Sequence, residues 1–314
     1  MKNILIWGNA SYYEKHVNLI RFEQYKGNID ILAYISKDKG YQSEQDGKPV
    51  ILPEDISKFN YDYIIVANSF FKEIIKSAIG LGISEDVLIP IDVFAIPMFD
   101  FNQYIRIKER KFSIVAESCY GAYLYKTLGL KLTSPFIDVR ISSKDYIKLL
   151  GNFEYYLSQP FEMGNDNRIA TINGDEWLSG PDTVGEPIAK LDDVKINLLH
   201  DESFELRKVL WEKRLARFNK ADVIVLMIIE NDLIAEAFDN LKIKNKIGFY
   251  FKDTPYQSII NINAWNDSKI RFTNFYQFKS YIHKMFNSIY HGNQDFNIFD
   301  LVEGKIISRK TFNF

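Results

Sequence analysis

Short apolar runs that alternate with helical segments constrain the fold of this chain more than any other feature. In the first hundred residues, such runs at residues 3–7, 29–35 and 61–67 have the continuous apolar character of buried strands. Helical stretches at residues 12–25 and 70–81 separate them. Strands that alternate with helices form βαβ units around a mostly parallel sheet. The sequence therefore predicts an α/β protein with a Rossmann-like N-terminal domain.

A second series of strand-like runs begins after a junction at residues 94–111. Its three clearest members lie at residues 112–116, 194–199 and 223–229. The last is apolar throughout, which is typical of a central strand buried on both faces. Because 314 residues exceed the size at which a single core usually keeps growing, we expect two domains, residues 1–95 and 111–314.

Two features shape the expected second domain. Residues 164–185 hold many Gly, Asn and Asp residues and are interpreted as a long surface excursion. Near the end of the chain, Glu303 and Gly304 lie between two apolar runs within residues 296–314, a pattern that favours a hairpin. The second domain is therefore predicted to be α/β with a C-terminal hairpin.

The composition limits the classes of function. A formal charge of −2 provides no electrostatic footprint for nucleic acid, so we expect no nucleic-acid partner. A single cysteine, Cys119, excludes an intramolecular disulfide and indicates a reducing compartment. The longest apolar run, residues 223–229, is far shorter than the roughly 18 residues that span a bilayer. The sequence thus predicts a cytoplasmic protein without a transmembrane segment.

The turn after the first predicted strand carries part of a dinucleotide-binding fingerprint. Gly8 and Asn9 stand where such folds bind a phosphate at a helix N-terminus, but Ala10 and Tyr13 replace the later glycines. Either Gly8 only makes a tight turn, or Gly8 and Asn9 contact a nucleotide or nucleotide-sugar, which needs less of the motif. Tight NAD binding is not expected, because Ala10 and Tyr13 would crowd the pyrophosphate. The sequence does not identify a cofactor.

Three reactive residues of the second domain, Cys119, His200 and Glu230, each follow a predicted strand. The carboxyl ends of parallel strands share one edge of a sheet, so the three side chains are expected to meet there. The dipole of the helix after Cys119 would favour its thiolate. We interpret Cys119 as nucleophile or ligand contact, His200 as general base and Glu230 as the group that orients His200. Ordinary alternatives stay open: a small buried side chain, a packing histidine and a helix cap.

Four further residues of the second domain are candidate ligand contacts: Ser118, Gly121, Ser134 and Arg214. Gly121 would let a ligand approach the start of the helix after Cys119. Arg214 could reach an anion from an amphipathic helix. Ser134 belongs to a turn that either binds an anion or has no ligand.

The remaining histidines, His16, His283 and His291, are interpreted as surface or packing residues. A single cysteine and scattered histidines lack the spacing of a zinc site, so no metal site is predicted.

The first domain resembles the small Rossmann-like domains of bacterial surface-sugar biosynthesis proteins, such as the N-terminal part of sugar O-acyltransferases. The resemblance rests on residues 3–8, 47–50 and 61–67 and covers about residues 1–92. It implies a fold and transfers no catalytic residue.

The second domain resembles a bacterial domain-of-unknown-function family labelled exopolysaccharide biosynthesis protein, which is found with capsule genes. The similar motifs are Ser118-Cys119-Tyr120-Gly121, residues 125–130, Ser134-Pro135, residues 146–150 and 155–157, and His200 followed by residues 211–214. The resemblance covers roughly residues 111–230. It implies a pathway, the synthesis of cell-surface polysaccharide, and no mechanism.

These observations predict a transferase, glycosyl or acyl, that acts on an activated sugar or glycan precursor in cell-surface polysaccharide biosynthesis. The alternative is a non-catalytic protein whose Rossmann-like half binds a nucleotide-sugar. Convergence of Cys119, His200 and Glu230 in one site would favour the enzyme. Burial of Cys119 away from His200 would favour the binding protein.

Overall fold

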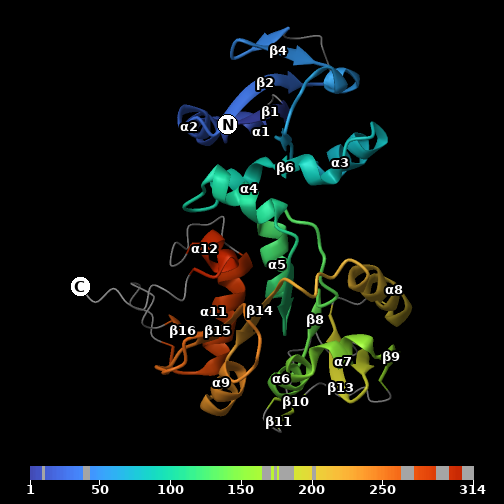
Figure 1. Ribbon diagram of the computed structural model, residues 1–314, viewed down its shortest axis with the longest axis vertical. Coiled ribbons are helices and arrows are strands. Elements are labelled where there is room, and N and C mark those ends of the chain that lie inside the picture. Colours follow the sequence, from blue (N-terminus) through green and yellow to red (C-terminus); the bar gives the residue numbers. More distant parts are fainter. Residues whose placement is uncertain are drawn as a thin grey trace, which may run out of the picture. The chain divides into compact units, whose positions relative to one another are not determined.

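The structure is a computed structural model that describes residues 1–8, 11–37, 43–164, 171–172, 175–176, 187–199, 203–262, 272–287 and 297–305. The chain divides into two compact units, residues 1–109 and 110–314 (Figure 1). The junction expected at residues 94–111 contains helix α4 (Phe101–Glu109), which is the last element of the first unit.

The first unit is built on a six-stranded sheet in the order β3-β4-β2-β1-β5-β6. Its strands are β1 (Lys2–Trp7), β2 (Ile29–Ile35), β3 (Glu44–Gln45), β4 (Lys48–Ile51), β5 (Tyr63–Val66) and β6 (Leu88–Pro90). All neighbouring strands are parallel except β3 and β4. Strand β1 lies inside the sheet, with β2 and β4 on one side and β5 and β6 on the other. This is the Rossmann arrangement, so the predicted N-terminal fold is confirmed.

The helices of the first unit are α1 (Ser11–Glu14), α2 (Val17–Tyr25), α3 (Phe71–Gly80) and α4, with short 3-10 helices η1 (Pro53–Lys58), η2 (Glu85–Val87) and η3 (Ile91–Ala95). The single helix expected over residues 12–25 is broken between α1 and α2. His16 is the N-cap residue of α2, and its Nδ1 lies 3.0 Å from the Tyr12 carbonyl oxygen. Buried apolar side chains of the sheet, including Leu5, Ile35 and Ile64, form the core of this unit.

The second unit contains a parallel sheet in the order β16-β15-β14-β7. Its strands are β7 (Ser113–Ala116), β14 (Val223–Ile228), β15 (Lys246–Tyr250) and β16 (Ile259–Asn261). Strand β14 lies between β7 and β15, and all of it after Val223 is buried. The prediction of a central strand from its continuous apolar run is therefore confirmed.

A second sheet, which is antiparallel, is formed by the segment between β7 and β14. Its order is β8-β13-β12-β9, with β8 (Val139–Arg140), β9 (Phe161–Met163), β12 (Ile188–Leu191) and β13 (Val194–Leu198). The strand expected at residues 194–199 exists, but the assumption that it joins the parallel sheet is wrong. The two-residue turn at Asp192 and Asp193 pairs β13 with β12 directly, so no crossover helix is needed.

The helices of the second unit are α5 (Tyr120–Thr127), α6 (Ser143–Gly151), α7 (Phe153–Ser158), α8 (Phe204–Leu215), α9 (Asp232–Asp239), α11 (Phe275–Asn287) and α12 (Ile298–Glu303). The predicted C-terminal hairpin is wrong for the described part of that segment, residues 297–305, because it forms helix α12. Asn297 caps its first turn through the backbone N–H groups of Phe299 and Asp300, and Gly304 ends it with a φ of 73°.

The surface excursion expected at residues 164–185 lies mostly outside the described residues. Within it, β10 (Thr171–Ile172) and β11 (Asp175–Glu176) pair antiparallel. In the part of the chain that the structure describes, none of the helices has the length and apolar character needed to cross a bilayer.

Candidate functional site

The carboxyl edge of the parallel sheet in the second unit carries the candidate site. Strands β7 and β14 are parallel neighbours, with Ala116 paired to Leu226, so the residues that follow them leave the sheet at the same edge. Cys119 comes three residues after β7, and Glu230 two residues after β14. The placement of these two residues at one edge agrees with the expectation from the sequence.

His200 lies outside the described residues. The argument that brought it to this edge does not hold, because the strand that precedes it, β13, belongs to the antiparallel sheet. In an antiparallel sheet successive strand ends point in opposite directions, so following a strand no longer fixes the edge.

His283 is the histidine found beside Cys119. Its Nδ1 lies 3.7 Å from the Cys119 Sγ, within the range of a weak sulfur hydrogen bond. The Ser118 hydroxyl donates to the same sulfur at 3.9 Å. Cys119 is 9% exposed, so the thiol is largely but not completely covered. The structure therefore forms a cysteine–histidine pair with a partner different from the one expected.

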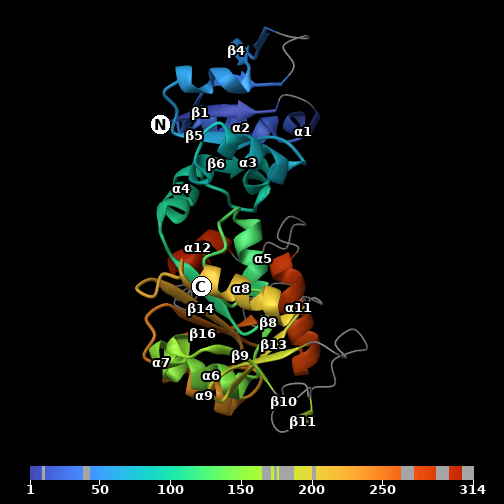
Figure 2. The ribbon, with the colours of Figure 1, turned by 90° about the vertical axis from the view of Figure 1, so that its right-hand side faces the viewer.

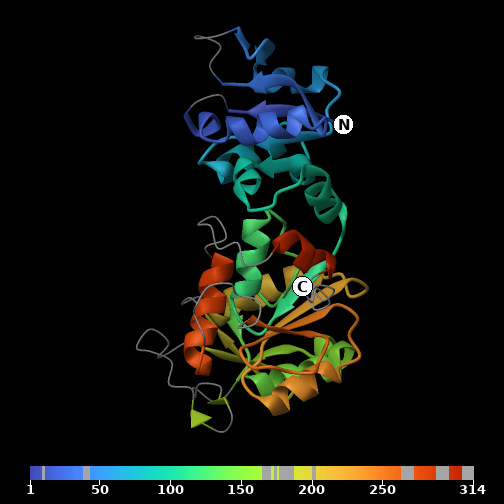
Figure 3. The ribbon, with the colours of Figure 1, turned by 90° about the vertical axis from the view of Figure 1, so that its left-hand side faces the viewer.

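The position of His283 follows from the packing of α11 against α5, which lie side by side in Figures 2 and 3. The Tyr120 ring packs edge-on against His283, with centroids 5.6 Å apart, and lies 5.4 Å from the Phe286 ring. The interpretation of His283 as a packing residue thus describes only part of its role, since the ring also contacts the thiol.

The electrostatic surroundings keep His283 neutral. Burial lowers its pKa to about 4, and the positive charges of Lys279 and Arg140 act in the same direction. Its Nε2 is buried and has no hydrogen-bond partner in the described ranges. A neutral imidazole at physiological pH can accept a proton from Cys119 at Nδ1.

Glu117 connects the ends of β7 and β14 at this edge of the sheet. Its Oε1 accepts a hydrogen bond from the Ile228 backbone N–H at 3.2 Å, and its Oε2 accepts one from the Tyr120 hydroxyl. The Ile141 backbone N–H donates to the Glu117 carbonyl oxygen at 2.9 Å, which holds the segment after β8 beside β7. Burial raises the pKa of Glu117 to about 7, although Lys279 and the Tyr120 hydroxyl oppose this shift.

Lys279 precedes His283 by one helical turn on α11, so both residues lie on the same face of the helix. Burial of its ammonium group lowers the pKa to about 8, while the negative charges of Glu117 and Glu230 raise it. Arg140 adds a second positive charge that lowers the pKa further. The edge thus combines two carboxylates with two cations in a mostly buried environment.

Glu230 is 8% exposed, and its two carboxylate oxygens are buried. Burial raises its pKa; the Ser143 hydroxyl, Lys279 and Lys144 act in the opposite direction. Neither oxygen accepts a hydrogen bond of good geometry from the residues that the structure describes, so the effect of Ser143 reflects proximity only. The helix cap expected in this segment is made by the neighbouring Asn231, whose Oδ1 accepts from the Ile234 N–H at 2.9 Å.

The structure places the other candidate contacts of the second unit in packed positions. A Cβ on Gly121 would lie 2.9 Å from the Ala116 Cβ, so this glycine lets α5 pack closely on β7. Ser134 is fully buried, and its Oγ accepts from the Phe136 N–H at 3.2 Å, as in an ordinary turn. Arg214 is buried on α8 and lines a small cavity with Pro135 and other residues of the antiparallel sheet region.

Gly8 in the first unit is explained by its backbone. Its φ is +116°, and a Cβ would lie 2.4 Å from the Ala67 carbonyl oxygen, so only glycine fits this turn. Asn9 and Ala10 lie outside the described residues. Tyr13 is buried, and its hydroxyl lies 2.9 Å from the Tyr34 hydroxyl. These observations favour the tight-turn interpretation of Gly8.

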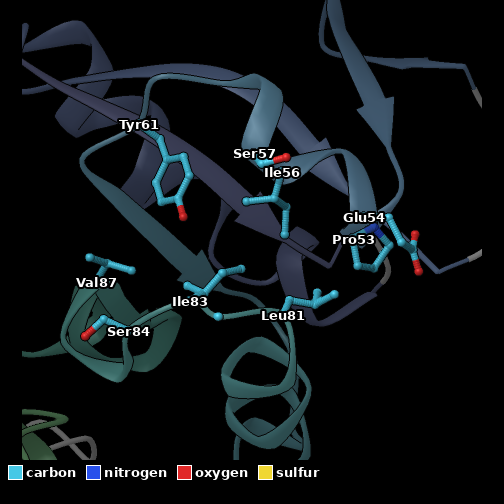
Figure 4. Close-up of a pocket in the computed structure, with 10 residues that line it drawn as sticks. Pro53, Glu54, Ile56, Ser57, Tyr61, Leu81, Ile83, Ser84 and Val87 are labelled. Atoms are coloured by element: carbon cyan, nitrogen blue, oxygen red, sulfur yellow. The ribbon is translucent and has the colours of Figure 1, made fainter.

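A pocket of about 290 Å³ lies elsewhere in the first unit (Figure 4). Tyr61, Ile83 and Leu81 line it together with residues of η1. Tyr61 precedes β5 and Ile83 precedes β6, so this part of the pocket adjoins the amino ends of the strands. Rossmann-like folds bind ligands at the opposite, carboxyl ends, and the pocket is therefore not the nucleotide site that the fold suggests.

Glu117, Lys279 and Arg140 are not among the site residues that the sequence predicts, and the sequence indicates only a surface or packing role for His283. Glu117 directly follows an apolar strand, which was a usable signal of the kind applied to Cys119 and Glu230. The four-residue spacing of Lys279 and His283 indicated one helix face, but nothing in the sequence indicated what that face contacts. Among the described residues, no three His, Cys, Asp or Glu side chains are grouped as metal ligands.

Comparisons with known proteins agree with the division of the chain. A family model described as C2185-like, N-terminal matches residues 1–89, and a model described as a domain of unknown function, DUF1919, matches residues 91–293. An uncharacterised protein of Haemophilus influenzae (strain ATCC 51907 / DSM 11121 / KW20 / Rd) is 25% identical over 154 residues, 48% of this chain and 66% of that protein. The chain therefore spans just under two thirds of that relative. Because the larger model covers more than half of the sequence, this chain belongs to the DUF1919 family.

Proposed function

We propose that the second unit is a transferase that passes an acyl group through Cys119 to a sugar or glycan precursor of cell-surface polysaccharide. The observation that carries this proposal is the 3.7 Å contact between the Cys119 Sγ and the His283 Nδ1 at the carboxyl edge of the parallel sheet. A nucleophilic thiol beside a neutral imidazole is the arrangement that covalent catalysis needs. The motifs of residues 111–230 supply the polysaccharide pathway in this proposal.

The chemistry of sulfur favours acyl over glycosyl transfer. In the first step, the Cys119 sulfur attacks the carbonyl carbon of an activated acyl donor while His283 Nδ1 accepts the thiol proton. The donor's leaving group departs with that proton and leaves a thioester. In the second step, an acceptor hydroxyl attacks the thioester, its proton passes through His283, and the thiol is restored. A thioester is reactive toward a hydroxyl group, whereas a thioglycoside is a stable compound.

The low pKa of His283 suits the step in which its imidazolium gives up the proton. With a pKa of about 4, an imidazolium formed between Lys279 and Arg140 is a strong acid and gives its proton readily to a leaving group. The positive charge of Lys279 also lies close enough to Cys119 to interact with the thiolate. Cys119 thus acts as nucleophile, His283 as proton carrier and Lys279 as the charge that supports the thiolate.

The proposal is tested by trapping the acyl-enzyme. The full chain is incubated with p-nitrophenyl acetate or acetyl-CoA, and the adduct is located by mass spectrometry of peptides. We expect one acetyl group on Cys119 in the wild type, much slower formation in His283→Ala, and none at this position in Cys119→Ser. Acetylation confined to surface lysines, or a Cys119 adduct whose rate ignores His283, would contradict the proposal. The nucleotide-sugar-binding alternative would then be favoured.

A further inference from the structure

Glu230 combines deep burial with unused hydrogen-bonding capacity. It is 8% exposed, and neither Oε1 nor Oε2 has a hydrogen-bond partner among the described residues. Buried carboxylates in folded proteins are nearly always paired or hydrogen-bonded, because leaving them unsatisfied costs free energy. An exception at the carboxyl edge of a parallel sheet, where ligands bind, requires an explanation.

Glu117 at the same edge provides a direct comparison. Both of its carboxylate oxygens accept hydrogen bonds, one from Ile228 and one from Tyr120, and the bond from Ile228 connects the end of β7 to β14. Glu230 has no equivalent structural role, because Asn231 caps α9 in its place. The two glutamates thus differ: both oxygens of Glu117 accept hydrogen bonds from the protein, and both oxygens of Glu230 are buried without a hydrogen-bond partner among the described residues.

The charges around Glu230 limit the kind of ligand group that can donate hydrogen bonds to its carboxylate. Lys279 and Lys144 both place positive charge near this carboxylate. They would repel an ammonium group on a ligand, whereas neutral hydroxyl donors meet no such repulsion. A carboxylate with two free oxygens accepts two hydrogen bonds side by side, one on each oxygen.

We propose that Glu230 binds a pair of neighbouring hydroxyl groups on the acceptor sugar, accepting one hydrogen bond on each carboxylate oxygen. The inference rests on the proposed function, since the acceptor of that reaction supplies the hydroxyl groups. It replaces the role of orienting His200 with a role in acceptor recognition. Glu230 would then determine which acceptor binds, and Cys119 and His283 would perform the chemistry.

The size of the effect follows from the strength of hydrogen bonds to a charged group. Glu230→Gln keeps the shape of the side chain but replaces one acceptor by an NH₂ donor that faces a hydroxyl group. We expect the dissociation constant of the sugar to rise about tenfold to a hundredfold. The same change in Glu236, which is exposed on α9, is the matched control and should leave binding unaltered.

Binding is measured separately from chemistry. Full-length Cys119→Ser protein, which cannot form the thioester, is titrated with methyl glycosides of glucose, galactose, mannose, rhamnose and N-acetylglucosamine. Saturation-transfer NMR measures the binding of each glycoside. The glycoside that binds best is then compared with its monodeoxy analogues. Each is titrated into the Cys119→Ser protein and into the Cys119→Ser protein that also carries Glu230→Gln. Removal of a hydroxyl that contacts Glu230 should weaken binding to the carboxylate form and have little further effect in the glutamine variant.

The outcomes separate this inference from the proposed function. If Cys119 is acetylated in the wild type but Glu230→Gln binds the glycoside unchanged, acceptor recognition by Glu230 is wrong and the transferase stands. If glycoside binding depends on Glu230 but Cys119 takes no acyl group, the sugar site stands and the transferase is wrong. No detectable binding of any of the five glycosides would overturn the inference as well.

Discussion

The Cys119 Sγ and the His283 Nδ1 lie 3.7 Å apart although 164 residues separate them in the sequence. The contact exists because α11, near the end of the described chain, packs on α5, the helix that begins directly after Cys119. The reactivity of the Cys119 thiol should therefore depend on His283. The buried charged groups around the pair should make the free energy of unfolding depend on pH.

Alkylation of Cys119 tests the pair directly. Iodoacetamide should modify Cys119 in the native wild-type protein at neutral pH, because the His283 imidazole can take the thiol proton as the sulfur attacks. His283→Ala should slow the reaction by about tenfold or more. His16→Ala, in the first unit, is the control that should change nothing. A thiol that reacts only after denaturation would identify Cys119 as a core residue.

The buried carboxyl of Glu117 predicts a pH dependence of stability. Its pKa in the folded protein, about 7, lies above the ordinary value of 4.5, so the native state binds more protons than the unfolded state between these values. The contribution of protonated Glu117 to the free energy of unfolding is fully present below about pH 4.5 and is lost as the pH rises through 7. Glu117→Gln should remove this loss, which is at most about 3 kcal/mol.

Urea unfolding of the wild type and Glu117→Gln across this pH range measures the effect as a difference between the two proteins. The variant should gain stability relative to the wild type as the pH rises. A difference that stays constant from acid to neutral pH would mean that Glu117 titrates normally in the folded protein.

Replacement of Glu230 should stabilise the protein. Burial without good hydrogen bonds raises its pKa, so the stability associated with its protonated form is lost as the pH rises above the ordinary range of a carboxyl group. At neutral pH, Glu230→Gln removes that cost and should raise the free energy of unfolding by about 1 kcal/mol. Thermal denaturation at neutral and acid pH checks this, since the gain should shrink in acid. A variant less stable than the wild type at neutral pH would assign Glu230 a structural role.

The turn at Gly8 should tolerate no side chain. Gly8→Ala combines a positive φ with a Cβ placed 2.4 Å from the Ala67 carbonyl oxygen, and we expect a loss of about 3 kcal/mol or more. Gly27 has a φ of +74°, but a Cβ added there would have no neighbouring atom within 4 Å, so Gly27→Ala isolates the cost of the backbone conformation alone. The first variant should be clearly less stable than the second by denaturant unfolding. Equal losses would show that the approach of Ala67 is not limiting.

The local sequence was sufficient for the elements whose character does not depend on distant partners. The apolar run of β14 is buried over its whole length after Val223, and Gly8 makes a tight turn with a φ of +116°. Such features follow from side-chain hydrophobicity and backbone sterics within a few residues. Because β7 and β14 are both short apolar strands of a parallel sheet, the sequence also brought Cys119 and Glu230 to one edge.

Tertiary structure decided the rest. An apolar run predicts a strand but not its partner, so the strand before His200 could be assigned to the wrong sheet. The segment around Glu303 and Gly304 carries signals for both a turn and a helix end, and packing of α12 selected the helix. Lys279 and His283 share a helix face in any context. Only the docking of α11 on α5 placed that face against Cys119 and Glu117, because contacts between distant segments depend on how whole elements pack.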